Sequence, residues 1–203
     1  MSPFELYFKL GFEHISDLGG YDHILFVIAL AAVYSLRNWK HMLVLVTAFT
    51  IGHSITLALA TTGRLVLHEG LIETLIPITI AVTALLNIVE RFTRDPQKTL
   101  ERDWRLKYIL AFFFGLIHGM GFSYYLRAIL GGEENFFVPL FSFNVGLEVG
   151  QLLILVITLI ASAVVVWLTN LVLNHFKRSV EHTQHNWSLL LSLVIAIWAL
   201  TLI

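Results

Sequence analysis

Apolar residues follow one another along most of this chain in long runs, which short polar segments interrupt. An α-helix needs about 20 such residues to cross the roughly 30 Å of hydrocarbon in a bilayer. Six runs reach or approach that length, at Tyr21–Leu36, His41–Thr62, Leu71–Val89, Leu106–Ala128, Asn144–Leu173 and Trp187–Ile203. The pattern predicts an all-α, polytopic bundle of six spans that forms one integral membrane domain over residues 1–203.

The segment before the first span has a different pattern. Residues Pro3–Leu18 mix aromatic and aliphatic side chains with Glu5, Lys9, Glu13 and Asp17. An apolar face opposite a charged face is typical of a helix that lies in the membrane interface. We therefore expect an N-terminal interfacial helix, or a short re-entrant element packed on the bundle.

The composition supports a membrane protein and excludes several other classes. Hydrophobic residues make up 57% of the chain and charged residues 13%, whereas soluble chains carry about 25% charged residues. The net charge of −1 gives no reason to expect a nucleic-acid partner. The chain has no cysteine, which excludes disulfides, thiolate metal sites and cysteine nucleophiles.

The distribution of basic residues predicts the orientation of the spans. Ten of the 13 Lys and Arg residues lie in the loops after the first, third and fifth spans: Arg37, Lys40, Arg91, Arg94, Lys98, Arg102, Arg105, Lys107, Lys177 and Arg178. Cytoplasmic loops carry such an excess. We expect both termini outside and the Arg91–Lys107 loop in the cytoplasm, with the protein in the inner (plasma) membrane of a bacterium.

Several polar side chains fall within or beside the spans, where a charged group costs about 2.5–3.5 kcal/mol on insertion scales. All of them are expected between mid-membrane and the outer surface. Histidine with carboxylate, without cysteine, is a ligand set for a divalent transition metal such as nickel, cobalt or zinc. The candidate metal ligands are His14, Asp22, His23, His53, His118 and Glu148.

Each of these residues also has a structural interpretation when it is considered alone. His53 and His118 could be hydrogen-bonding residues between packed helices. Asp22 and Glu148 could be interface charges, and Glu148 could cap its helix. The shared depth of the residues, which come from four spans and the N-terminal segment, favours a common metal site.

A polar stripe along the third span has two interpretations. The stripe consists of Thr79, Thr83, Asn87 and Glu90. These residues recur at spacings of four, four and three, so they share one helix face. The stripe is either a seam between packed helices or the inner part of a transport path. The candidates for lining such a path, including two residues that flank Glu148, are Thr79, Thr83, Asn87, Glu90, Asn144 and Gln151.

Five short blocks carry a resemblance to a known family. They are GFEHI (Gly11–Ile15), GYDHILF (Gly20–Phe26), TAFTIGHSITL (Thr47–Leu57), GLIHGMGF (Gly115–Phe122) and FNVGLEVGQ (Phe143–Gln151). In this order they resemble the second branch of the HupE/UreJ family of hydrogenase and urease accessory membrane proteins. The resemblance implies a nickel or cobalt permease in which His14, Asp22 and His23 handle the metal.

Two functions remain as expectations. The first is a permease, or a metal-binding membrane protein, with an outward-facing site for a divalent nickel- or cobalt-type ion. The alternative is an intramembrane zinc hydrolase acting on a lipid or a membrane-embedded peptide, with Glu148 and Ser54 as its catalytic candidates. In either case the expected partners are the metal ion and membrane lipid, together with a second copy of the chain or accessory proteins.

Overall fold

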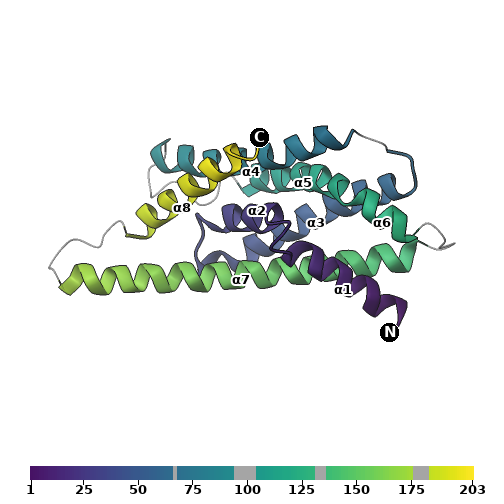
Figure 1. Ribbon diagram of the computed structural model, residues 1–203. Coiled ribbons are helices and arrows are strands. Elements are labelled where there is room, and N and C mark those ends of the chain that lie inside the picture. The colour runs from purple at the N-terminus through teal and green to yellow at the C-terminus, as the bar shows by residue number, and fades with distance from the viewer. Residues whose placement is uncertain (66–67, 94–103, 131–135, 176–182) are drawn as a thin grey trace.

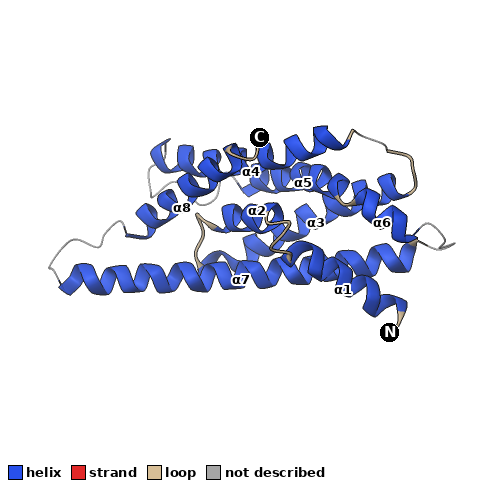
Figure 2. Ribbon diagram, viewed as in Figure 1, coloured by secondary structure: helices blue, strands red, loops and turns tan. Residues whose placement is uncertain are grey.

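Helices make up all the regular structure of the described residues, which are 1–65, 68–93, 104–130, 136–175 and 183–203 of this computed structural model (Figures 1 and 2). The elements are α1 (Pro3–Ser16), α2 (Asp22–Ala31), η1 (Leu36–Asn38), α3 (Trp39–Thr61), α4 (Glu69–Thr93), α5 (Trp104–Gly121), α6 (Ser123–Leu130), α7 (Phe137–His175) and α8 (Thr183–Leu200). The expected all-α bundle is confirmed. The prediction for the Arg91–Lys107 loop falls largely outside the described residues.

Three of these helices are long and apolar enough to cross a membrane: Trp39–Thr61, Gly70–Glu90 and Phe137–Asn174. By length and composition they make the chain an integral membrane protein. Two further apolar helices, α2 and part of α8, are shorter. The count of six spans stays a prediction.

The first and fourth expected spans differ from the helices that are found. Helix α2 has ten residues and rises about 15 Å, half the thickness of the hydrocarbon. The chain turns after Ala31, and Ser35 and Asn38 then cap the short helix η1. The fourth expected span is divided at Phe122 between α5 and α6.

Helix α7 is much longer than a single crossing requires. Its 39 residues extend over about 58 Å at 1.5 Å per residue, so the helix exceeds the hydrocarbon thickness at one end or both. Helix α1 packs along the Phe137 end of α7, and α6 lies near the same end (Figure 1). The N-terminal helix is therefore a packed part of the bundle.

Glycines let the central helices approach backbone to backbone. A Cβ atom on Gly52 of α3 would collide with the Phe112 carbonyl group of α5, and one on Gly115 of α5 would collide with the Phe49 carbonyl group of α3. A Cβ atom on Gly119 would likewise meet the backbone of His53. Small residues permit this close packing in membranes, and here they bring α5 against the helix turn that carries His53.

Replacing Gly115 by alanine is expected to destabilise the bundle by about 1–3 kcal/mol, the usual cost of overpacking. The added methyl group can only be accommodated if α3 and α5 move apart. Thermal unfolding in detergent, followed by helical circular dichroism, measures the effect. Gly121→Ala is the control, because a Cβ atom there meets only side-chain methyl groups of Ile76 and Ile72. Equal stability of the two variants would contradict this account of the α3–α5 contact.

Candidate metal centre

Three histidines converge where α1 ends and α2 begins. His14 lies in the last turn of α1, His23 is the second residue of α2, and His53 comes from α3. One ring nitrogen from each lies within 4.8 Å of the others. The ring centroids of His14 and His23 are 4.7 Å apart, and that of His53 is 6.1 and 6.3 Å from theirs. These three residues are the trihistidine centre.

The nitrogens of the centre are buried and available. Nε2 of His14, Nε2 of His23 and both ring nitrogens of His53 make no hydrogen bond to any described residue. Buried polar atoms without partners are rare in folded proteins, and each calls for an explanation such as a missing ion or water. Three such imidazole nitrogens within mutual reach fit the ligand chemistry of a divalent transition metal.

The turn between α1 and α2 brings His14 beside His23. Seven residues separate His14 from Asp22 in the sequence, and α1 ends at Ser16. In the turn that follows, the Asp17 carboxylate accepts a hydrogen bond of 2.8 Å from the Gly19 backbone N–H. The short turn therefore keeps the end of α1, with His14, close to the start of α2, with His23.

Asp22 orients His23 and does not belong to the group of converging nitrogens. Its Oδ1 lies 3.1 Å from Nδ1 of His23. A carboxylate can only accept, so Nδ1 carries the hydrogen and Nε2 keeps its lone pair. Such a carboxylate–histidine pair is the usual outer support of a metal-binding imidazole.

His118 adjoins the centre from α5. Its ring centroid lies 5.0 Å from that of His23. The Thr79 hydroxyl donates its single hydrogen to the Ile76 carbonyl oxygen at 2.7 Å and lies 2.9 Å from Nε2 of His118. Nε2 must then donate to Thr79, which leaves Nδ1, buried and without a partner, as the nitrogen with a free lone pair.

Aromatic rings surround the centre. The His14 ring lies 4.0 Å from that of Phe122 and 5.8 Å from that of Phe143, between centroids. Phe26 and Phe49 lie 5.1 and 5.2 Å from His118. An apolar environment lowers the local dielectric constant and so strengthens interactions with a bound cation.

The protonation state of His14 suits metal binding. Burial is the main cause that holds its pKa well below the ordinary value for histidine, and the neighbouring His23 and His53 lower the pKa further. His14 is therefore neutral at neutral pH. A neutral imidazole offers the lone pair that a metal requires.

Glu148, Ser54 and Gln151 lie outside the trihistidine centre, where they make hydrogen bonds of their own. Glu148 accepts a hydrogen bond of 2.6 Å from the Thr47 hydroxyl, and Gln151 accepts one of 2.9 Å from Thr50. The Ser54 hydroxyl donates to the Thr50 backbone carbonyl at 2.6 Å. The first two bonds join α3 to α7 and so fix the helix that carries His53.

Asn144 lies beside His53 on the side of α7. Its amide nitrogen donates to the Leu140 carbonyl at 2.7 Å. Its side-chain oxygen is buried and makes no hydrogen bond to a described residue. Of the two polar residues expected to flank Glu148, Asn144 is therefore the one that adjoins the centre.

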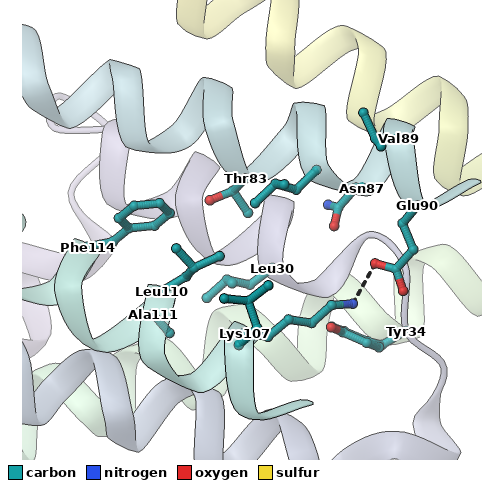
Figure 3. A pocket seen from close by; sticks show the side chains of 12 residues that line it. Leu30, Tyr34, Thr83, Asn87, Val89, Glu90, Lys107, Leu110, Ala111 and Phe114 are labelled. Atoms are coloured by element: carbon teal, nitrogen blue, oxygen red, sulfur yellow. Dashed lines mark hydrogen bonds and ion pairs between the residues drawn. The ribbon is translucent and has the colours of Figure 1, made fainter. Parts of the chain in front are cut away.

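The polar stripe of α4 runs from the contact between Thr79 and His118 to a partly open cavity. Thr79 contacts His118, as described above. Thr83, Asn87 and Glu90 line a cavity of about 260 Å³ between α2, α4 and α5 (Figure 3). Lys107 of α5 reaches into the same cavity and pairs with Glu90 at 2.7 Å. In the sequence Lys107 was counted among the loop charges, although it already lies inside the expected span Leu106–Ala128.

One comparison with known proteins identifies the family of this chain. The family model described as HupE / UreJ protein matches residues 1–202. Neither the search of curated proteins nor that of solved structures gave a match. The five sequence blocks lie within the matched range, and they contain the three histidines of the centre. Because the match covers essentially the whole chain, this integral membrane protein belongs to the HupE/UreJ family.

Proposed function

We propose that this protein is a permease for a divalent transition metal of the nickel or cobalt type. The trihistidine centre captures the ion on the outer side, and the polar face of α4 conducts it inward. The observation that carries the proposal is the convergence of three buried imidazole nitrogens within 4.8 Å. A nitrogen-rich set without sulfur suits nickel, cobalt or zinc better than magnesium or calcium.

A route inward from the centre supports transport rather than storage. Thr79 begins the route at His118, and Thr83 follows one helix turn further along α4. Glu90 lies 11 residues beyond Thr79, which corresponds to about 16 Å of helix. The route thus runs from nitrogen donors to hydroxyl, amide and carboxylate oxygens. Those oxygens hold a transition metal more loosely and so allow its release.

The broken path of α1 and α2 also supports transport. The two short helices follow one another beside α7, with the turn at the trihistidine centre between them (Figure 1). Discontinuous helices next to a bound ion are a recurring feature of membrane transporters. A junction of this kind can change its geometry more readily than the middle of a continuous helix.

The proposed orientation has the centre facing outward. It rests on the excess of basic residues in the loops after the first, third and fifth expected spans. Arg105 and Lys107 belong to that set and lie at the start of α5, and Lys107 also lines the cavity. The ion would then enter at the His14 end of the bundle and leave at the Glu90 end, in the inner membrane of a bacterium.

The observed contacts give the hydrolase alternative little support. The Ser54 hydroxyl is bonded to the backbone of its own helix, and the Glu148 carboxylate is bonded to Thr47. A general base needs to reach a metal-bound water within hydrogen-bond distance. Both groups hold helices together in this arrangement, and we therefore favour transport.

Uptake into reconstituted vesicles tests the proposal. Liposomes that contain the purified protein and an enclosed nickel-sensitive dye are expected to accumulate external nickel faster than liposomes without protein, with an inside-negative potential applied. The reason is that a divalent cation is driven inward at about 4.6 kcal/mol per 100 mV. Nickel that binds to the protein but never reaches the enclosed dye would contradict a permease and leave a metal-binding protein.

A further inference from the structure

The inner cavity is lined mainly by apolar side chains, together with a few polar ones. Leu30, Leu110 and Phe114 contribute apolar side chains, and Asn87 and Glu90 contribute polar ones (Figure 3). The volume of about 260 Å³ is several times the roughly 30 Å³ that a water molecule occupies in the liquid. The cavity is therefore large enough for a cation that keeps part of its hydration shell.

The Glu90 carboxylate forms an ion pair with a lysine of the same chain, Lys107. Lys107 Nζ lies 2.7 Å from Glu90 Oε2, and the two side chains are only 21% and 22% exposed. A charge in such a place requires a partner of opposite sign. The ammonium group therefore stands where a bound metal cation would stand.

The Lys107 ammonium group also contacts two aromatic rings while it is paired with Glu90. Its Nζ lies 4.9 Å from the centre of the Tyr34 ring and 5.7 Å from that of Trp104. Aromatic faces attract an ammonium group at such distances, and the four-carbon stem of lysine is flexible. The ammonium can thus leave Glu90 without losing all of its stabilising contacts.

The neighbouring oxygens are suited to a cation. The Asn87 amide nitrogen donates to the Ala29 carbonyl oxygen at 2.8 Å, which leaves the amide oxygen as the group free to turn to the cavity. The Thr83 hydroxyl donates to the Thr79 carbonyl at 2.8 Å, so its oxygen retains lone pairs. Together with Glu90 these groups form a set of oxygen ligands for a divalent cation.

We propose that the inner cavity is a second, transient cation site, in which Lys107 occupies the Glu90 carboxylate until a divalent cation displaces it. The inference rests on the proposed function, because it makes this cavity the last site that the metal ion occupies before it is released. Lys107 keeps the site closed when no ion arrives. It also lowers the affinity for an arriving ion, since the ion must compete with a tethered charge, and low affinity favours release.

Nickel binding to the purified full-length chain tests the inference. Lys107→Met removes the competing charge and keeps the length of the side chain. Equilibrium dialysis against nickel is expected to give one more bound ion per chain than in the wild type, with that step tightened about tenfold or more by the loss of a charge at contact distance. In the double variant Lys107→Met/Glu90→Gln, the additional ion should disappear.

A matched control comes from the exposed pair of Lys9 and Glu13, which lie 3.6 Å apart. Lys9→Met removes the lysine partner of a surface carboxylate, and it should bind no additional ion. An unchanged stoichiometry in Lys107→Met, or an additional ion that persists in the double variant, would overturn the inference. An equal gain of bound nickel in Lys9→Met would also overturn the inference.

A measurement on the wild type covers the case in which Lys107→Met fails to fold. Displaced from Glu90, the Lys107 amine should react faster with an acylating reagent when nickel is raised, by about tenfold or more if the contact is lost. A labelling rate that nickel does not change would overturn the inference. Both measurements can be repeated in His53→Ala, so failure of the outer centre, which refutes the proposed function, is distinguishable from failure of the inner site.

Discussion

His53→Ala is expected to weaken metal binding to the purified protein by more than about 100-fold. Even the outer hydrogen-bonding partners of metal ligands contribute about 10–100-fold in affinity, and His53 is expected to be a ligand itself. Its ring lies on α3, wholly buried, so no other part of that helix can replace the nitrogen. Competition with a chromophoric chelator in detergent measures the change.

His68→Ala is the matched control, because His68 is an exposed histidine before α4. It should leave the affinity unchanged. The variants must retain the helical content and thermal stability of the wild type, since a buried ring replaced by alanine leaves a cavity. If a folded His53→Ala protein binds nickel or zinc as tightly as the wild type, the trihistidine centre is not the metal site.

Glu90→Gln is expected to reduce metal uptake in metal-depleted cells by about tenfold or more, while the purified variant keeps the metal of the outer centre. The carboxylate is far along α4 from Thr79 and cannot reach the outer ligands. Its loss removes the negative charge that we assign to the inner route and so weakens the attraction for an arriving cation. Uptake of a radioactive metal and metal analysis of the purified variant give the two readouts.

Glu13→Gln provides the control for this experiment, since it neutralises an exposed carboxylate that also pairs with a lysine. Uptake and metal content should both stay at the wild-type level. Normal uptake by Glu90→Gln would refute the inner route along α4. A simultaneous loss of outer metal would mean that Glu90 supports the bundle as a whole and has no specific part in the passage of the ion.

The hydrophobic pattern predicted the helical class because that class depends on local sequence. Long apolar runs have few alternatives to helix in a membrane. Counting residues along the expected spans predicted a similar depth for His23 and His53. The convergence of these two with His14 agrees with the expectation that polar residues of different spans meet at one level.

The parts that the sequence did not predict depend on contacts between distant segments. The pattern of apolar runs placed the break between α1 and α2, but it did not show that α2 ends at Ala31 or that the fourth expected span divides at Phe122. Glu148 was expected near the metal, but its bond to Thr47 depends on the rotation of α7 against α3. Lys107 faces Glu90 because α4 and α5 lie side by side. Counting the basic residues in each loop predicts the side of the membrane for Lys107 but not its partner.

X-ray absorption of the zinc-loaded protein tests the central claim most directly. Three imidazole nitrogens from His14, His23 and His53 should surround the metal at about 2.0–2.1 Å. The histidine signal should fall by one ring in His53→Ala if any zinc remains bound. A first shell made mainly of oxygen, or a histidine signal that the removal of His53 does not change, would contradict the assignment of the trihistidine centre.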